Sequence, residues 1–385
     1  MEKVIAPVLY APKKIRTETF PTPKVGAREA LVRMVGSAVC GTDKHVFKQG
    51  EIRLGLPGDV VSLPIILGHE NVGVIEKIGD AAASEMVTEG EPLEEGERVV
   101  ISADIVCGKC YYCRNIYGFP WCLNHKSYGD VISCKDPPHL FGGFAEKMFV
   151  LPGTFMFRVP KRMSNEVAAL TEQMAVAYGS FGRAFQNPNV KEGYSPADTV
   201  VVQGVGPLGM CNALMARMLG ASKIIAIDKS RYRLEMARAL CNAETVDIGE
   251  YPRPKDRLEA VLSMTEGLGG DTVIECTGFP HIISEGLDMI RNGGTYLVEG
   301  AYSEDSGTKI SASRQILAKN ARIIGVSGMP FQAYSRALKM MDAYSSVIPF
   351  GKMVTHVFGQ EDAQEALETS MGTESMKVVV GRMKA

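Results

Sequence analysis

Residues 198–228 read DTVVVQGVGPLGMCNALMARMLGASKIIAID, and this stretch decides the fold of the second half of the chain. The apolar run at 199–203 has the length and β-branched content of a buried strand, and a glycine-rich turn follows it at once. Helical composition over 210–219 comes next, and a second apolar run at 224–228 ends on an aspartate. Strand, glycine turn, helix and strand in this order predict a parallel sheet with crossover helices.

The glycine turn has the form GxGxxG, and Asp228 follows its last glycine by nineteen positions. The motif is specific only when it follows a strand, opens a helix and precedes such an acidic residue, and all three conditions hold here. Gly204 permits the tight turn, Gly206 lets the backbone approach a pyrophosphate, and Gly209 allows close helix packing. We therefore expect a doubly wound Rossmann sheet that binds a dinucleotide. The predicted cofactor contacts are Gly204, Gly206, Pro207, Leu208, Gly209, Asp228 and Arg233.

The residues after the second strand bear on which dinucleotide binds. A carboxylate at Asp228 can bind both ribose hydroxyls and would repel a 2′-phosphate, which favours NAD. Lys229 and Arg231 weaken this preference, because nearby cations could accommodate that phosphate. NAD is the prediction and NADP the alternative.

The alternation of strands and helices continues toward the C-terminus. Further strands are expected at 272–278, 294–298 and 323–326, with helices at 230–242, 281–292 and 331–345. The last elements do not fit another strand–helix repeat of this kind. They are strands at 355–358 and 377–380 and a helix at 362–370. We expect them to rejoin the first domain. The predicted organisation is a catalytic domain at 1–175, a dinucleotide-binding domain at 176–328 and a returning segment at 329–385.

The first domain has a different pattern. Residues 4–35 alternate short β-branched runs with proline and glycine, and two further strands are expected at 72–78 and 98–102. These features predict an antiparallel barrel or sandwich. The acidic segment 80–97 between the two strands is expected to be a solvated surface loop.

A candidate catalytic metal site lies in this domain, in Cys40-Gly-Thr-Asp-Lys-His45 and Gly68-His69-Glu70. A thiolate and an imidazole from two loops are two of the three protein ligands that a catalytic zinc takes, and the remaining position stays open. Alone, Cys40 could be a small buried hydrophobe and His69 a core histidine. Glu172 lies in an apolar stretch where an unpaired carboxylate would be costly. A metal would partner it, and a helix-surface glutamate is the alternative.

A second metal motif consists of Cys107, Cys110 and Cys113, each separated by two residues, and Cys122 after eight more. Four thiolates at such spacing can close a tetrahedral shell, and a shell without an open position is structural. An iron–sulfur cluster is the alternative, but the sequence has no second cluster motif. Zinc binding would order a lobe that has little apolar surface.

Composition excludes other classes of protein. A chain of 385 residues is expected to form two domains, and its net charge of −2 gives no footprint for nucleic acid or an anionic membrane. Nine cysteines are too few for a disulfide scaffold. The sequence has neither a signal-peptide pattern nor a membrane-spanning run, so a cytosolic location is expected.

Together these motifs resemble the zinc-dependent medium-chain dehydrogenase/reductase family over nearly the whole chain. The resemblance implies a GroES-like β-barrel catalytic domain plus the Rossmann domain, with one catalytic and one structural zinc. Cys40 and His69 would be zinc ligands, and Glu70 a ligand or an exchange partner for the zinc-bound water. Alcohol dehydrogenases of the family have a cysteine where this chain has Glu172, and a glutamate there is similar to the sorbitol, threonine and butanediol dehydrogenase branch. Asp43 matches the carboxylate that orients the zinc-bound histidine.

The implied reaction is reversible oxidation of an alcohol, chiefly a secondary alcohol or polyol, with NAD. The Thr42 hydroxyl would take the alcohol proton and pass it through the nicotinamide ribose to His45, whose ordinary pKa lies near physiological pH. The family also implies a homodimer or homotetramer, because its last Rossmann strands often pair between subunits.

The chain departs from the family pattern at two points. The fourth lobe cysteine comes one residue late, with Trp121 in the usual place. The loops at 48–64, 80–97 and 123–140 look longer than in compact members of the family. The identity of the substrate therefore does not follow from the resemblance.

Two other classes of protein remain as alternatives. One is a metal-independent carbonyl or enone reductase, against which both zinc motifs argue. The other is a non-catalytic nucleotide-binding protein, which would have no chemical reason to keep Cys40, Thr42, His45 and His69 together.

Overall fold

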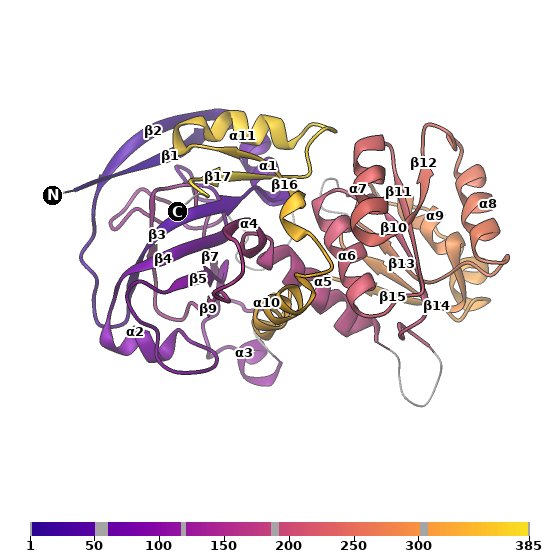
Figure 1. Cartoon of the computed structure of the whole chain (residues 1–385), viewed down its shortest axis with the longest axis horizontal. Helices are drawn as coiled ribbons and strands as arrows, with labels where there is room; N and C mark the ends of the chain where they lie inside the picture. Colours follow the sequence, from indigo (N-terminus) through magenta and orange to yellow (C-terminus); the bar gives the residue numbers. More distant parts are fainter. Residues whose placement is uncertain (1, 51–60, 117–120, 186–191, 301–306, 384–385) are drawn as a thin grey trace. The chain divides into compact units, whose positions relative to one another are not determined.

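The computed structural model describes residues 2–50, 61–116, 121–185, 192–300 and 307–383, and the chain forms two compact units (Figure 1). Unit 1 comprises Met1–Glu172 and Pro330–Ala385, and unit 2 comprises Gln173–Met329. The first division falls inside helix α5 (Thr171–Ala184), three residues before the predicted boundary. Most of the 48–64 loop, residues 51–60, lies outside the described residues.

Unit 1 is built on a seven-stranded sheet whose main path runs β16-β17-β3-β4-β5-β9, with β8 paired to β3. An antiparallel hairpin of β1 and β2 and a short pair of β6 and β7 accompany it. The C-terminal strand β17 pairs antiparallel with β3, so the last segment of the chain completes this sheet. The strands of unit 1 are β1 (Lys3–Ala11), β2 (Lys14–Pro21), β3 (Ala30–Ala38), β4 (Glu70–Ile78), β5 (Arg98–Ile101), β6 (Asp104–Ile105), β7 (Lys126–Ser127), β8 (Lys147–Val150), β9 (Met156–Arg158), β16 (Val354–Phe358) and β17 (Lys377–Gly381).

Inward-facing β-branched and aliphatic side chains of these strands form one core. Val32, Ile75 and Val99 come from three neighbouring strands and are at most 1% exposed. Burial of this apolar surface is the main force that holds the sheet closed.

Several helices of unit 1 were not expected from the sequence. Helix α1 (Gly41–Gln49) occupies the stretch expected to be a metal-binding loop, and α2 (Asp80–Glu85) begins the stretch expected to be a solvated loop. Helix α1 forms because Asp43 caps it and Val46 and Phe47 bury its inner face. The remaining helices of unit 1 are α3 (Tyr111–Asn115), α4 (Asn165–Ala168), α10 (Gln332–Tyr344), α11 (Ala363–Ser370) and the 3₁₀ turns η2 (Phe350–Met353) and η3 (Gln360–Asp362).

Unit 2 is a six-stranded parallel sheet in the order β12-β11-β10-β13-β14-β15, which is the 3-2-1-4-5-6 order of a Rossmann fold. Helices α6 and α7 lie on one side of this sheet and α8 and α9 on the other (Figure 1). The strands are β10 (Thr199–Gln203), β11 (Lys223–Asp228), β12 (Glu244–Asp247), β13 (Gly270–Glu275), β14 (Ile290–Val298) and β15 (Arg322–Gly325). The helices are α6 (Pro207–Met218), α7 (Arg231–Cys241), α8 (Pro254–Met264), α9 (Ile282–Met289) and the π-helix η1 (Ala312–Leu317).

Several elements of unit 2 differ from the sequence prediction. Strand β12 and helix α8 were missed, and the helix expected over 281–292 ends at Met289 because β14 begins at Ile290. β12 has only four residues, two of them acidic, so periodicity gives little signal there.

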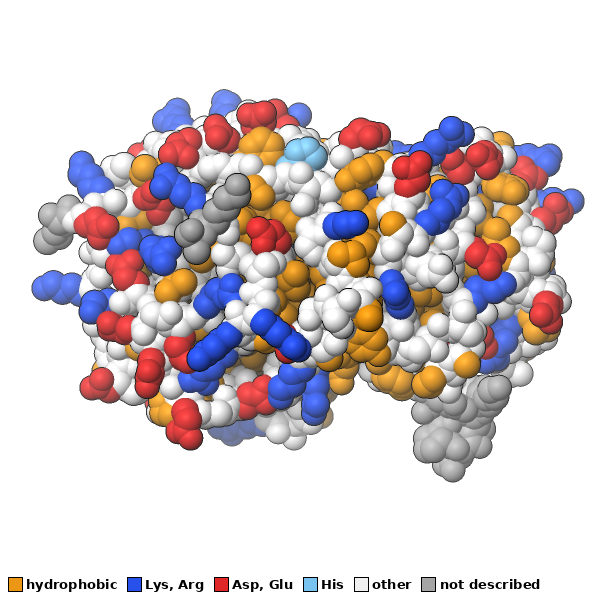
Figure 2. Space-filling model, in the orientation of Figure 1, with side chains coloured by type: hydrophobic (Ala, Val, Ile, Leu, Met, Phe, Trp, Pro, Cys, Tyr) orange, Lys and Arg blue, Asp and Glu red, His pale blue; other side chains and the backbone are white. Residues whose placement is uncertain are grey.

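Acidic and basic side chains are interspersed over the visible face of the molecule (Figure 2), which fits the net charge of −2. None of the helices in the described residues combines the length and apolar composition that a bilayer crossing requires. The cytosolic location stays a prediction.

Candidate active site and structural metal site

Asp43 joins the two segments that carry the predicted catalytic ligands. It is fully buried, its Oδ2 accepts a hydrogen bond of 2.8 Å from the backbone N–H of Cys40, and its Oδ1 accepts one of 3.0 Å from that of Gly68. Oδ1 also lies 3.5 Å from Nδ1 of His69. The carboxylate therefore orients the imidazole from its Nδ1 side. Burial lowers the pKa of His69, but Asp43 and Cys40 more than offset this and raise it well above its ordinary value.

Cys40, His69 and Glu70 converge on one point. Each residue offers one ligand atom, and each of these atoms lies within 4.8 Å of the other two. The atoms are the thiol sulfur, a ring nitrogen and a carboxylate oxygen. Cys40 is the N-cap of α1, and Glu70 is the first residue of β4. The start of a helix and the start of a strand therefore fix the positions of these two donors. These are donor types that zinc prefers.

Lys377 is a buried partner of Glu70 that sequence reasoning missed. Its Nζ lies 2.6 Å from Oε1 and 2.5 Å from Oε2 of Glu70, and both side chains are 0% exposed. Burial raises the pKa of Glu70, and Lys377 counteracts part of that rise. The signal in the sequence was a single lysine opening an apolar strand, 307 residues away from its partner.

Glu172 lies outside the group of three donors but is coupled to it electrostatically. Burial foremost, and then the charge of Glu70, raise the pKa of Glu172 to about 8, although His69 and Lys377 act to lower it. A divalent cation at the donor group would offset the charge of both carboxylates. The sulfur donor, which is half-buried, and the buried nitrogen and carboxylate donors thus fit a catalytic zinc.

Thr42 and His45 both lie on α1, three residues apart and therefore on neighbouring positions of one helix face. The Thr42 hydroxyl is 3.9 Å from the Cys40 sulfur. His45 is half-buried, and burial together with Lys44 and Lys48 lowers its pKa. A neutral imidazole at physiological pH can accept a proton.

Two further carboxyl groups beside this site, Asp104 and Asp130, were not predicted. Asp104 is 8% exposed and pairs with Ser127 across β6 and β7. Burial and then the charge of Asp130 raise the pKa of Asp104 to about 7, while His125 and His69 lower it. Isolated aspartates beside two-residue strands have no spacing pattern, so sequence motifs do not single them out.

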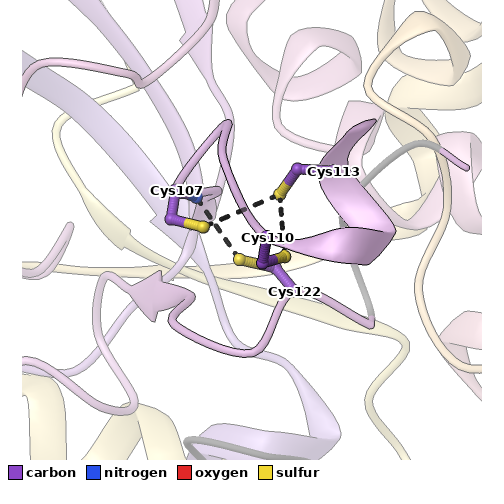
Figure 3. Close-up of side chains that lie close together, drawn as sticks. All are labelled: Cys107, Cys110, Cys113 and Cys122. Atoms are coloured by element: carbon purple, nitrogen blue, oxygen red, sulfur yellow. Dashed lines mark hydrogen bonds between the residues drawn. The ribbon is translucent and has the colours of Figure 1, made fainter. Parts of the chain in front are cut away.

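The four lobe cysteines meet at a second point (Figure 3). Sulfur-to-sulfur distances are 3.9 Å between Cys107 and Cys113 and 3.5 Å between Cys110 and Cys113. A tetrahedral zinc with Zn–S bonds of about 2.3 Å keeps its sulfurs about 3.8 Å apart, so the cluster fits that ion. Cys122 joins the group despite its late position, and its sulfur accepts a 3.3 Å hydrogen bond from the Cys107 N–H.

Backbone N–H groups, that of Lys109 foremost, lower the pKa of Cys107 to about 6. Burial and the sulfurs of Cys110 and Cys122 raise the pKa of Cys113 to about 12. Metal ligands must be deprotonated, and a divalent cation is what lets four thiolates share so small a volume.

The glycine turn of unit 2 has the geometry that its sequence predicts. Gly204 has φ of 84°, a left-handed conformation that favours glycine. Gly206 caps α6 and Pro207 is its first residue, so the free N–H groups of the helix start face outward. A Cβ on Gly209 would lie 1.8 Å from the carbonyl oxygen of Gly204, so no other residue fits there.

Asp228 ends β11, the strand next to β10. Its Oδ2 accepts a 2.8 Å hydrogen bond from the Val205 N–H and its Oδ1 one of 2.8 Å from the Ser230 N–H. The carboxylate is thereby held against the glycine turn. Arg233 lies nearby, with Nη1 3.6 Å from the position of a Cβ on Gly206.

Glu275, at the end of β13, is a further buried carboxylate that the sequence did not single out. It is 0% exposed, and Oε1 accepts N–H bonds of 2.6 Å from Thr277 and 2.9 Å from Gly278. Oε2 accepts a 3.0 Å bond from the Gly300 N–H. One carboxylate therefore ties the loop after β13 to the loop after β14, at the sheet edge where Rossmann folds bind ligands.

Comparisons with known proteins agree with this geometry. Residues 26–161 match the alcohol dehydrogenase GroES-like domain and residues 207–343 match the zinc-binding dehydrogenase domain. The fold and donor sets define a zinc-binding dehydrogenase. More particularly, the chain belongs to the zinc-dependent medium-chain alcohol dehydrogenase family, which confirms the predicted family and fold class.

Similar proteins span the full length of the chain. It is 29% identical over 99% of both chains to the 5-exo-hydroxycamphor dehydrogenase of Pseudomonas putida. It is 28% identical to the L-threonine 3-dehydrogenase of Bacillus subtilis, over 94% of this chain and 93% of the relative. A crystal structure of an alcohol dehydrogenase from Thermotoga maritima has a TM-score of 0.88 and 28% identity, over 99% of this chain and 100% of that one.

Proposed function

We propose that this protein is a zinc- and NAD-dependent oxidoreductase that interconverts an alcohol, chiefly a secondary alcohol or polyol, and its ketone. The observation that carries the proposal is the convergence of Cys40, His69 and Glu70 within 4.8 Å, in a chain whose second unit has a dinucleotide-binding turn. Relatives named for threonine and hydroxycamphor oxidation support a substrate with a CH–OH group.

Cys40, His69 and Glu70 would hold the catalytic zinc, with Glu172 as the alternative carboxylate ligand. Zinc supplies Lewis-acid polarisation that lowers the pKa of an alcohol, and NAD supplies the hydride acceptor. Asp43 keeps the imidazole of His69 oriented through its Nδ1 side, and Lys377 offsets the charge of Glu70.

The proton of the alcohol would leave along α1. The Thr42 hydroxyl, 3.9 Å from the Cys40 sulfur, takes the proton. His45 receives it by way of the nicotinamide ribose and releases it to solvent, since its lowered pKa keeps the ring neutral and ready to accept.

The remaining predicted groups have their own roles in the proposal. Asp228 favours NAD over NADP, because its fixed carboxylate would repel a 2′-phosphate. Cys107, Cys110, Cys113 and Cys122 hold a second, structural zinc.

A homodimer or homotetramer is supported by the open edge of the Rossmann sheet. β15 ends the described sheet, and the apolar side chains of Ile310, Leu317 and Ile323 near that edge are 37%, 74% and 40% exposed. An unpaired strand edge bordered by apolar groups is a template for strand pairing with a second copy.

Metal analysis and a substrate screen test the proposed function together. Zinc-loaded protein should contain two zinc ions per chain and reduce NAD or NADP with at least one member of a panel of polyols, diols and amino alcohols. Cys40→Ser should lose one zinc and the activity, whereas Cys134→Ser, which changes a buried cysteine outside both donor groups, should keep both. A carbonyl reductase activity that survives in Cys40→Ser would favour the metal-independent class. Binding of NADH without any turnover would favour a non-catalytic protein.

A further inference from the structure

A row of basic side chains crosses the sheet of unit 1. Arg33 of β3 lies opposite Val74 of β4, and Val74 lies opposite Arg98 of β5. On its other side, Arg33 faces Lys147 of β8. Residues directly opposite one another on paired strands project from the same face of a sheet, and like charges placed in this way destabilise it. Three cations therefore share one face with a single valine among them.

The same side chains line a hollow of unit 1 with a volume of about 470 Å³. Arg382, the residue that follows β17, lines this hollow as well. Pockets for small molecules commonly have volumes of about 300 to 1,000 Å³. None of the described residues that line the hollow belongs to the proposed zinc donors or to the four-cysteine lobe. The hollow is therefore separate from both metal sites.

Lys147 already has its counter-ions. Its ammonium lies 2.8 Å from a carboxylate oxygen of Glu2 and 2.7 Å from one of Glu76. Glu146, the other acidic residue of the lining, accepts a 2.9 Å hydrogen bond from the Ile5 N–H through its Oε2. The acidic groups at the hollow are thus engaged with the lysine or with the backbone.

Arg98 is half-buried, and its guanidinium donates to neutral oxygens. Nη1 donates a 2.7 Å hydrogen bond to the Asn165 side-chain oxygen, and Nη2 donates to the carbonyl oxygens of Pro160 and Met163. Burial lowers the pKa of Arg98, and no acidic group offsets this effect. A partly desolvated cation without a counter-charge is costly, so a bound anion would stabilise it.

Two further guanidinium groups at the hollow are also without a counter-charge. Arg33 and Arg382 are exposed, and neither forms a hydrogen bond or an ion pair with another residue that the structure describes. Asn165 connects the end of β17 to Arg98, because its amide nitrogen donates a 2.8 Å hydrogen bond to the carbonyl of Met383. Three arginines thus reach one hollow from β3, from β5 and from the end of β17.

This set of groups specifies the chemistry of a ligand. A guanidinium stays charged at any ordinary pH, and its planar fork of N–H donors matches the oxygens of a phosphate. Glu2 and Glu146 also line the hollow, and their carboxylates disfavour a second anionic group on the same ligand. Carboxylate oxygens accept hydrogen bonds from hydroxyl groups. A single phosphate on a neutral, hydroxyl-bearing molecule fits both requirements.

We propose that this hollow is a binding site for a small phosphate monoester whose other groups are neutral hydroxyls, with the phosphate held by Arg33, Arg98 and Arg382. The inference does not rest on the proposed oxidoreductase function, because it uses neither the zinc donors nor the dinucleotide turn. The ligand would carry almost two negative charges at physiological pH, since the second pKa of a phosphate monoester is near 6.

Calorimetry on the zinc-loaded protein at about pH 7.5 and low ionic strength tests the inference with three probes. Glycerol 3-phosphate should bind saturably, and glycerol should give no measurable binding. 3-Phosphoglycerate, which adds a carboxylate, should bind at least about fivefold more weakly than glycerol 3-phosphate. Added salt should weaken the binding of both phosphates, because ions screen the attraction to exposed arginines.

Two variants locate the binding site. Arg33→Gln and Arg382→Gln each remove one guanidinium that no described residue uses to hold the fold, and each should weaken the binding of glycerol 3-phosphate about tenfold. Arg336→Gln, which changes an exposed arginine of α10 outside the hollow, is the matched control and should leave the affinity unchanged. The urea midpoint of all three variants should equal that of the unmodified protein.

A phosphate could also bind at the start of α6 after the glycine turn, and NADH distinguishes the two sites. Binding of glycerol 3-phosphate that persists with saturating NADH and falls in Arg33→Gln and Arg382→Gln would support the inference. Binding that NADH abolishes, equal affinity in the two variants and the unmodified protein, or no saturable binding would overturn it. Failure of the proposed function looks different, because alcohol oxidation would then be absent while this phosphate still binds.

Discussion

Replacing Lys377 by methionine would leave Glu70 as an unpaired carboxylate with no exposure to solvent. The two oxygens of Glu70 lie 2.6 and 2.5 Å from the ammonium, and both side chains are 0% exposed. Removing one member of a buried ion pair costs about 3 to 5 kcal/mol, because the remaining charge is desolvated without compensation. We expect Lys377→Met to lower the stability of metal-free unit 1 by an amount in that range.

The double variant Glu70→Gln/Lys377→Met separates the cost of an orphaned charge from the worth of the pair. With both charges gone, most of the lost stability should return, because a neutral buried pair has no ion to desolvate. The matched control is Lys339→Met, which breaks a lysine–glutamate pair with Glu89 in which both side chains are more than half exposed. Exposed pairs contribute about 1 kcal/mol or less, so this control should change stability little.

Urea unfolding of metal-free protein at pH 7 is the assay. The one tryptophan, Trp121, belongs to unit 1, so its fluorescence reports on the unit that contains the pair, and circular dichroism reports on the whole chain. A loss below about 1 kcal/mol in Lys377→Met, or a double variant as unstable as the sum of the two single variants, would refute the reasoning.

Three other predictions follow from the site. Cys113→Ser should lose one zinc per chain by metal analysis and lower the thermal midpoint, whereas Cys241→Ala, a packing cysteine of unit 2, should keep both zincs. Thr42→Val should remove most turnover while zinc stays bound, and His45→Gln should slow turnover most at low pH; full activity in Thr42→Val would reject the relay. The lowered pKa of His45 sets the direction, because the ring stays a neutral proton acceptor at low pH, where solvent bases that could replace it in His45→Gln are scarce. Glu275→Gln should weaken NADH binding about tenfold in a fluorescence titration. The reason is that an amide cannot accept all the N–H bonds that the carboxylate accepts from the loops after β13 and β14. Unchanged affinity would show that these loops keep their shape without the carboxylate.

The parts of the site that could be predicted from sequence are those whose chemistry is written in local spacing. The GxGxxG turn and the four-cysteine lobe place their functional atoms through a few consecutive residues, so their positions follow from the chain itself. Cys40 and His69 were identified because each lies in a short motif.

The parts that could not be predicted depend on contacts between distant segments. Lys377 meets Glu70 across 307 residues, and nothing in its neighbours marks it as a charge partner. Asp104 is paired with Ser127 through β6 and β7, two strands of two residues each, which are too short for a spacing pattern to mark them. The sequence predicts a loop where helix α1 lies, because this short stretch is rich in polar residues. In the folded chain the cap formed by Asp43 and the burial of Phe47 stabilise the helix.

The placement of β17 beside β3 has a consequence for biosynthesis. The ammonium that neutralises Glu70 is supplied by a segment that is synthesised after all of unit 2. A nascent chain can complete its Rossmann sheet while the oxidoreductase pocket still lacks its counter-ion and a strand of its sheet. Proteolysis that removes β17 would therefore deprive the proposed metal site of Lys377 and of one sheet strand, while every strand of the described parallel sheet of unit 2 would stay in place.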